Sequence, residues 1–194
     1  MSMYETNWSY QAELDAVNDI LGAIGESPVS TLEGDVSVDV VNARRILQKV
    51  NKTEQAKGWT FNIDEDAKLY PDAYSKLIPF MPNYIRLVST GGTPYVNRGG
   101  FVYDRIEKTD RFDSEVSCQM VLLMGFDEMP EIFKQYIVAK AAKQFNIQFF
   151  GSPEIDTVLG NEIQDLTTAI NEYETDYGGF NVFNDSSISQ NIQR

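Results

Sequence analysis

Carboxylates are the side chains of this chain whose types and spacing could support catalysis. The 194 residues contain no histidine. That excludes histidine-based nucleophilic triads and removes the commonest general base. Glycoside hydrolysis instead needs two carboxyl groups, about 5 Å apart or about 6.5–9.5 Å apart. The candidate catalytic residues for such a reaction are Asp104, Asp110, Asp113, Glu128 and Glu131.

The composition weakens this enzymatic interpretation. The chain carries 29 acidic and 16 basic residues, a net charge of −13, so close carboxylates arise by chance. Acidic residues at a helix start, such as Glu128 and Glu131, also have an ordinary structural role, because they face the positive end of the helix dipole. The neighbouring aromatic residues Tyr103 and Phe112 could stack on sugars. A polysaccharide-degrading glycoside hydrolase therefore stays as the alternative hypothesis.

No cofactor and no metal ion is expected. The acidic triplet at 64–66 lacks the glycine and the distal glutamate of a calcium-binding EF-hand loop. There is no Walker or dinucleotide-binding glycine motif, so Gly99 and Gly100 are interpreted as a turn. The single cysteine, Cys118, lies in an alternating segment and is expected to be a small buried side chain.

The stretch 95–113, YVNRGGFVYDRIEKTDRFD, is expected to form a partner-binding surface. A glycine pair between aromatic and β-branched residues is typical of a strand–turn–strand element. Arginines suit contacts between proteins because the guanidinium group can form two parallel hydrogen bonds with one acceptor group. The candidate contact residues are Arg98, Phe101, Tyr103, Arg105 and Arg111, with Phe180 and Phe183 near the C-terminus.

The charge also bears on location and on nucleic acids. Affinity for DNA comes mainly from Lys and Arg that neutralise phosphates, which disfavours a DNA-binding regulator. An acidic wall would instead suit a protein past which DNA moves without binding. The longest apolar run, 120–124, is far shorter than a membrane span, and residues 1–10 do not resemble a signal peptide. A soluble protein made in a cytoplasm is expected.

Hydrophobic periodicity predicts four helices around a set of strands. Helical spacing covers 11–24, 35–57, 130–149 and 152–177, with Asp35 as a possible cap of the second helix. The fourth has a narrow apolar seam, suited to a core helix or to a partner helix. The predicted strands are 59–63, 84–89, 95–97, 101–105 and 115–124.

This element order predicts an α+β fold, a four-helix bundle built from both chain ends with an inserted, mainly antiparallel β subdomain. The predicted domains are 1–58 plus 127–178 for the helical bundle and 59–126 for the β subdomain. Residues 179–194 form a polar C-terminal tail, which is expected either to be disordered or to fold onto a neighbouring subunit.

Several short motifs in order along the chain resemble one family. They are VNDIL at 17–21, PVSTLEGD at 28–35, NARRIL at 42–47, GWTFNI at 58–63, VNRGG at 96–100, VYDR at 102–105, DRFDS at 110–114, DEMPE at 127–131 and DYGG at 176–179. Together they resemble the tail tubular protein A family of short-tailed bacteriophages. The sequence from Phe180 onward departs from this pattern.

The resemblance implies a structural virion protein, synthesised in the bacterial host cytoplasm and located in the tail. Members of the family form a dodecameric ring, the head–tail adaptor or gatekeeper, between the portal protein and the tubular nozzle protein. Tail fibres attach nearby, and DNA leaves through the lumen during genome ejection. The expected partners are thus further copies of the chain, the portal protein, the nozzle protein and the tail fibre, with no membrane. The hydrolase alternative would then be a capsule- or exopolysaccharide-degrading activity carried by the tail component.

Overall fold

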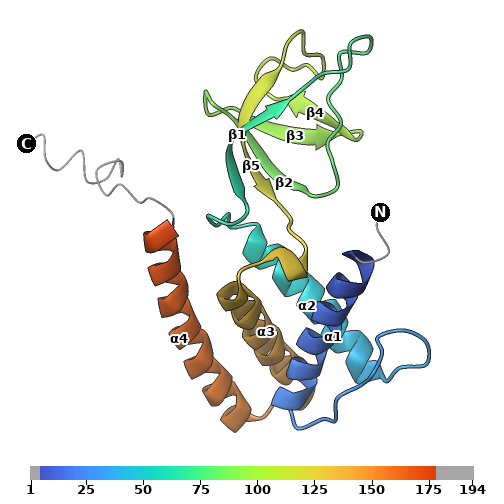
Figure 1. The fold of residues 1–194 in the computed structure, drawn as a ribbon, viewed down its shortest axis with the longest axis vertical. Helices are drawn as coiled ribbons and strands as arrows, with labels where there is room; N and C mark the ends of the chain where they lie inside the picture. Colours follow the sequence, from blue (N-terminus) through green and yellow to red (C-terminus); the bar gives the residue numbers. More distant parts are fainter. Residues whose placement is uncertain (1–4, 178–194) are drawn as a thin grey trace, which may run out of the picture. The chain divides into compact units, whose positions relative to one another are not determined.

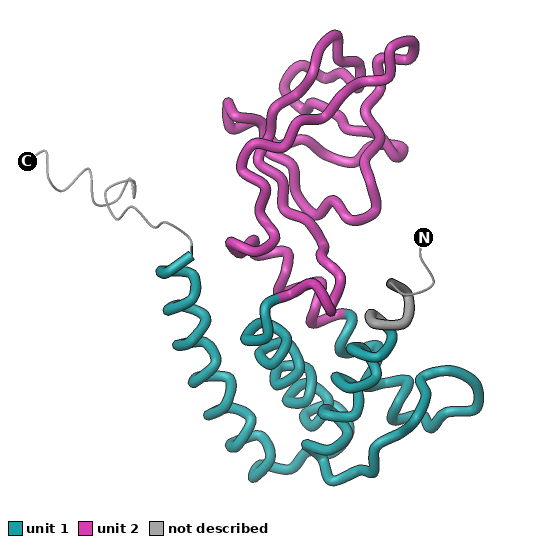
Figure 2. Tube along the Cα trace, viewed as in Figure 1, with its two compact units in different colours: residues 1–48, 130–194 teal, residues 49–129 magenta. Residues whose placement is uncertain are grey.

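The structure, a computed structural model, describes residues 5–177, with side chains from residue 10 onward. The predicted tail 179–194, with Phe180 and Phe183, lies outside this range. Contacts divide the chain into two compact units, residues 1–48 with 130–194 (unit 1) and residues 49–129 (unit 2) (Figure 2). The helices are α1 (Glu5–Ala23), α2 (Val38–Gln55), α3 (Glu131–Phe145) and α4 (Pro153–Tyr177) (Figure 1). With an antiparallel five-stranded sheet in unit 2, the mixed α+β class is confirmed.

Helix α3 is the centre of unit 1, because it packs against both α1 and α4. The ring of Phe133 on α3 meets Tyr173 on α4 edge to face, with centroids 5.5 Å apart. Small residues on α3, Ala139, Ala141 and Ala142, are fully buried and allow close helix packing. The apolar residues of the unit 1 core include Leu14, Val17, Ile20, Leu21, Val40, Ala43, Ile46, Leu47, Phe133, Ile137, Phe145, Leu159 and Ile170.

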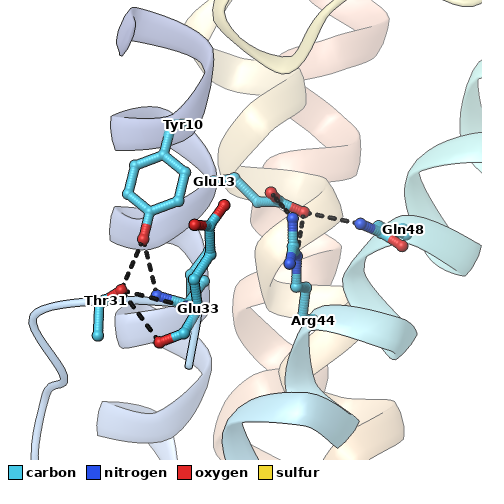
Figure 3. A network of polar contacts seen from close by, with 7 residues as sticks. Tyr10, Glu13, Thr31, Glu33, Arg44 and Gln48 are labelled. Atoms are coloured by element: carbon cyan, nitrogen blue, oxygen red, sulfur yellow. Dashed lines mark hydrogen bonds and ion pairs between the residues drawn. The ribbon is translucent and has the colours of Figure 1, made fainter. Parts of the chain in front are cut away.

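Polar contacts hold α1, α2 and the loop between them together within unit 1 (Figure 3). Arg44 on α2 forms an ion pair with Glu13 on α1, at 2.9 Å. The Tyr10 hydroxyl lies 3.0 Å from the Thr31 hydroxyl and accepts a hydrogen bond from the backbone of the loop. The side-chain amide of Asn18 exchanges two hydrogen bonds with the backbone of Val29. The long loop is therefore fixed to α1 by side chains.

Helix α3 does not continue to residue 149 as the periodicity predicts. It ends at Phe145 and is followed by one π-helical turn, Asn146–Phe150. The buried amide of Asn146 holds the turn, since it donates to the Ser152 carbonyl at 2.8 Å and accepts from the Ser152 N–H at 3.2 Å. Gly151 then adopts a left-handed conformation, φ 71°, which favours glycine. The Ser152 hydroxyl caps α4 by accepting from the N–H of Ile155.

Unit 2 is a sheet with strand order β1-β5-β2-β3-β4, and every pairing is antiparallel. The strands are β1 (Ile63–Leu69), β2 (Tyr84–Ser89), β3 (Pro94–Arg98), β4 (Phe101–Asp104) and β5 (Val116–Leu122). One face is buried in a core built from Ala67, Leu69, Ile78, Leu87, Val102, Cys118 and Met120. Cys118 is fully buried, as expected, and burial followed by the nearby Asp64 charge raises the pKa of its thiol.

Two sequence-based element boundaries are wrong. Residues 59–63 do not form a strand, because Asn62 is buried in a turn in which its side chain accepts from the N–H of Trp59 at 2.7 Å. The sheet begins only at Ile63. Helix α2 starts at Val38, and its cap is Ser37 rather than Asp35, since the Ser37 hydroxyl accepts from the N–H of Val40. Among the described residues, no helix has the length and apolar character needed to cross a membrane.

Candidate functional site

The candidate site is the β3–β4 hairpin of unit 2, whose strands lie close to the predicted bounds. Arg98 pairs with Phe101 across a two-residue loop. The loop residues Gly99 and Gly100 have φ values of 62° and 86°, the backbone conformation that a tight type I′ turn requires and that glycine adopts without strain. The Asn97 side chain accepts from the N–H of Gly100 at 3.0 Å, which closes the turn.

Strand register places three of the predicted contact residues on one face of the hairpin. Because side chains alternate along a strand, Phe101 and Tyr103 lie opposite to the fully buried Val102. Arg98 faces Phe101 across the hairpin and therefore shares its side. The inner face is core, whereas this outer face combines one exposed arginine with two half-buried aromatic rings.

The outer face is held in position before any partner binds. The guanidinium carbon of Arg98 lies 4.0 Å from the centroid of the Tyr103 ring, a cation–π contact between diagonal neighbours on the two strands. A long side chain that is already stacked loses less conformational freedom on binding. Arg105, just after β4, is exposed, and among the described residues its side chain has no hydrogen-bond or ion-pair partner.

The edge of the sheet at β4 is covered by its own chain. The N–H of Val102 donates to the Ile78 carbonyl, and the N–H of Phe80 donates to the Gly100 carbonyl, both at 2.9 Å. These bonds use the backbone groups through which an added strand would pair. A partner would therefore contact the side-chain face of the hairpin rather than extend the sheet.

Arg111 has a structural role that its sequence context does not reveal. Its guanidinium donates to the backbone carbonyl of Ser75 and forms an ion pair with Asp110 at 3.5 Å. The next residue, Phe112, donates its N–H to the Lys76 carbonyl and packs edge to face on Tyr95. These contacts fix the loop after β4 onto the loop before β2.

Each candidate catalytic carboxylate has a structural partner. Asp104, 9% exposed, accepts from the N–H groups of two turn residues at 2.7 and 2.9 Å. Asp110 pairs with Arg111, and fully exposed Asp113 lies 3.9 Å from the ammonium of Lys76. Glu128 accepts from a loop N–H at 2.9 Å, and Glu131 pairs with a lysine one turn along α3. All five carboxylates therefore take part in contacts within the chain.

Two further observations on the described residues bear on metal binding and on the hydrolase alternative. Within residues 5–177, no group of three or more His, Cys, Asp or Glu side chains could hold a metal ion. A shallow depression on α4 is lined by Thr168, Asn171, Glu172, Thr175 and Asp176. It has no aromatic lining residue on which a sugar could stack, so it does not support the hydrolase alternative.

Sequence reasoning missed Val96 as part of the hairpin surface. Val96 pairs directly with Tyr103, and it is half-buried beside the aromatic ring on the outer face. The signal was present in the sequence, since a two-residue loop at 99–100 fixes which residues of the two strands face each other.

Comparison with known proteins found a family model and a phage protein that are similar to this chain. A family model described as tail tubular protein matches residues 14–180. The tail tubular protein A of Klebsiella phage KP34 is 28% identical over 141 residues, which cover 72% of this chain and 74% of that protein. The match to the family model covers α1 from residue 14 onward, the other three helices and the whole sheet of unit 2. The resemblance drawn from short motifs is therefore confirmed.

Proposed function

Because the chain belongs to the tail tubular protein family, we propose that it is the adaptor that joins the portal vertex of a phage head to the tail nozzle. Family membership gives the chain a structural role in the phage tail and a place in the virion. The proposal adds that twelve copies form a closed ring, that DNA passes through its lumen, and that tail fibres attach nearby. The match over residues 14–180 is the observation that carries it.

The charge of the chain supports a role beside moving DNA. A net charge of −13 repels phosphates, and an acidic wall keeps DNA from sticking during ejection. The passage of DNA would then need no specific binding.

In the proposed ring the two units have different roles, one in packing between copies and the other in docking to the next tail component. The proposal keeps the domain boundaries expected from the sequence, 1–58 with 127–178 and 59–126, and the closure of the four helices into one bundle. The apolar seam of α4 supports that closure, because Leu159 and Ile170 are buried while Leu166 remains half-buried. The helical part would pack the ring, and the sheet would present the hairpin to the next tail component.

The hairpin face supports docking by its chemistry. Arg98 stacked on Tyr103, with Phe101 beside it, combines the residue types that dominate binding energy at protein interfaces. Arg105 adds a second exposed guanidinium. We include these four residues in the proposal as the contact with a neighbouring tail protein. Arg111 is left out because its guanidinium is used within the chain.

Removal of the gene from its phage tests the adaptor role. DNA-filled heads without an attached nozzle are the expected product, and expression of the chain from a plasmid should restore complete particles. Purified chain mixed with portal protein should form ring-shaped complexes visible by electron microscopy. The proposal is wrong if the nozzle still joins the portal in particles that lack the chain.

A substitution in the hairpin tests the docking face separately. Arg98→Glu combined with Tyr103→Ala should leave rings on the portal intact but prevent attachment of the next tail protein. Loss of such a central pair typically weakens binding by 2 kcal/mol or more, about thirtyfold. The matched control is Lys68→Glu, which also reverses an exposed charge in unit 2 but lies on β1 at the other edge of the sheet. Equal nozzle attachment in both variants would remove the hairpin from the proposal.

A further inference from the structure

The outer face of α2 carries an exposed stripe, here called the α2 stripe, that the described part of the chain leaves uncovered. Its members recur every three or four residues and so lie on one side of the helix. They are Val38, Val41, Arg45, Lys49 and Lys52. The two valines are 73% and 54% exposed. The buried residues of α2, including Ala43, Leu47 and Val50, lie on the opposite side.

The cations of the α2 stripe are unlike the other cations of the helices. On α3, Lys134 pairs with Glu131, Lys140 contacts the Tyr136 hydroxyl, and Lys143 pairs with Asp156 of α4. Arg44, next to the stripe, is engaged by Glu13. For Arg45, Lys49 and Lys52, by contrast, the described residues provide no hydrogen-bond or ion-pair partner to the side chain.

Helix α4 carries an exposed stripe of opposite charge, here called the α4 stripe. Its members also recur every three or four residues, except for one seven-residue interval between Asp165 and Glu172. They are Glu154, Val158, Glu162, Asp165, Glu172 and Asp176. All are exposed, and Val158 is 65% exposed. The residues that α4 buries, Leu159 and Ile170, lie to one side of this stripe.

The two stripes match in order as well as in charge. At a rise of about 1.5 Å per residue, Arg45 and Lys49 lie about 6 and 12 Å beyond Val41. Glu162 and Asp165 lie about 6 and 10.5 Å beyond Val158. Two helices laid side by side in the same direction would therefore place valine against valine, with Arg45 and Lys49 each opposite a carboxylate. Such pairing combines burial of exposed apolar side chains with charge complementarity.

From this match we propose that the α2 stripe of one copy of the chain is the docking site for the α4 stripe of the next copy. The contact is heterologous, because each copy uses a different stripe toward each neighbour, and a contact of this kind generates a ring when the rotation closes. The inference rests on the proposed assembly of the chain with itself and names the surfaces that perform it. DNA is the other ligand that three cations could attract, but phosphates would leave the valines exposed and the α4 stripe unexplained.

Charge reversal on each stripe tests the contact. The α2 variant carries Arg45→Glu, Lys49→Glu and Lys52→Glu. The α4 variant carries Glu162→Lys, Asp165→Lys and Glu172→Lys. Each is expressed in cells infected by the phage that lacks its own copy of the gene, and infectious particles are counted. Either variant alone should lower the yield by about a hundredfold or more, since like charges would then face each other across every contact.

Co-expression of the two variants is the decisive measurement. An α2-reversed copy beside an α4-reversed copy restores opposite charges at both kinds of contact, so the mixture should recover a yield within about tenfold of the wild type. One chain with all six substitutions should recover it too. Recovery also shows that the variants fold. Two controls show whether a loss of yield comes from misfolding. One is thermal melting of each purified variant, and the other is a milder set of substitutions, Arg45→Gln, Lys49→Gln and Lys52→Gln.

The outcomes separate this inference from the proposed function. If folded single variants give wild-type yields, or if the mixture and the six-substitution chain stay inactive, the stripes do not meet and the inference is overturned. Loss with the α2 variant alone, together with retention of DNA by the wild type on a low-salt gel, would assign the α2 stripe to nucleic acid instead. If the phage needs no copy of the chain at all, the proposed function itself fails.

Discussion

Arg44 on α2 forms two hydrogen bonds with the carboxylate of Glu13 on α1. Its Nε donates to one carboxylate oxygen at 3.0 Å and its Nη2 to the other at 2.9 Å (Figure 3). Gln48, one turn further along α2, adds a third hydrogen bond at 2.8 Å. The Glu13 side chain is 20% exposed, so the contact is partly shielded from water. It fixes the orientation of two helices that are separated in sequence by a long loop.

Removal of the guanidinium should therefore lower the stability of unit 1. Arg44→Met keeps the aliphatic part of the side chain but leaves a partly buried carboxylate with one partner, Gln48. We expect a loss of about 1–2 kcal/mol in the free energy of unfolding. Arg45→Met is the matched control, because Arg45 is exposed and should change stability by less than about 0.5 kcal/mol. Urea titration followed by circular dichroism measures both, and equal midpoints would contradict the prediction.

Two carboxylates of α1, Glu13 and Asp19, should affect the stability of unit 1 in opposite directions as the pH changes. Burial alone would raise the pKa of Glu13, but the hydrogen bonds from Arg44 and Gln48 and the Arg44 charge outweigh it and lower that pKa. Burial, followed by the charges of Asp15 and Glu131, raises the pKa of Asp19. Because its folded-state pKa is depressed, Glu13 stabilises the fold above its ordinary pKa of 4.5, and this contribution is lost as pH falls through the folded value.

Asp19 has the reverse effect, since an ionised group with a raised pKa costs stability at neutral pH. Glu13→Gln should thus destabilise the protein at pH 7, whereas Asp19→Asn should stabilise it slightly. Below the ordinary pKa of 3.8 for Asp19, its penalty disappears, and at still lower pH the Glu13 contribution is lost as well. Unfolding midpoints in urea at pH 7 and about pH 3 are the measurement. Effects of the same sign for the two substitutions at pH 7 would contradict these pKa directions.

Asn62 should be one of the least replaceable polar residues of unit 2. It is 2% exposed, and its amide donates to the carbonyls of Gln55 and Leu122 at 3.0 and 2.8 Å. Its oxygen accepts from the N–H of Trp59. Asn62→Leu fills a similar volume but leaves three backbone groups without these partners. Since each buried unsatisfied group costs about 1–3 kcal/mol, we expect a loss of at least about 3 kcal/mol.

An exposed asparagine gives the matched control for this substitution. Asn161→Leu on the outer side of α4 makes the same chemical change without breaking a buried network, and it should alter stability by less than about 0.5 kcal/mol. Cys118 provides a local readout, because its fully buried thiol becomes reactive only when unit 2 opens. Faster labelling of Cys118 by a thiol reagent is expected in Asn62→Leu and not in the control. Unchanged labelling would show that the turn at Asn62 does not limit opening of the sheet.

The sequence predicted elements whose apolar periodicity comes from a single buried face. Strand β2 begins and ends at the predicted residues, Tyr84 and Ser89, and the hairpin around Gly99 was recognised from its turn residues. Strand β1 was missed beyond Ile63, because three acidic residues at 64–66 break the alternation. They are tolerated because they lie exposed at the start of a strand on the edge of the sheet, and Ala67 and Leu69 supply its buried positions.

The features that the sequence did not predict depend on contacts between residues far apart in the chain, and no local pattern could reveal such contacts. Arg111 is predicted to be an interface residue, but its guanidinium donates to the Ser75 carbonyl, 36 residues away in the sequence. The turn at Asn62 depends on the carbonyl of Leu122, 60 residues further along the chain. Asp104 is a candidate catalyst by residue type, because glycoside hydrolysis needs paired carboxyl groups, yet it accepts hydrogen bonds from two N–H groups of its own turn.

Substitution of two glycines separates the effect of backbone conformation on stability from the effect of packing. A Cβ added at Gly22 of α1 or at Gly100 of the hairpin would meet nothing within 4 Å, so neither site is limited by space. They differ in backbone, because Gly100 has φ 86° whereas Gly22 lies within a helix. Gly22→Ala should therefore stabilise the protein by about 0.5–1 kcal/mol, since alanine loses less conformational entropy in a helix.

Gly100→Ala should instead destabilise unit 2 by about 1–2 kcal/mol, because alanine is strained at a positive φ. It should also disturb the outer face that carries Arg98 and Phe101, which flank the turn. Differential scanning calorimetry of the two variants tests the sign of each change, with shifts of about 2–4 °C per kcal/mol for a chain of this size. A rise in melting temperature for both variants would show that the turn accepts alanine and that the glycine pair is not required for the hairpin.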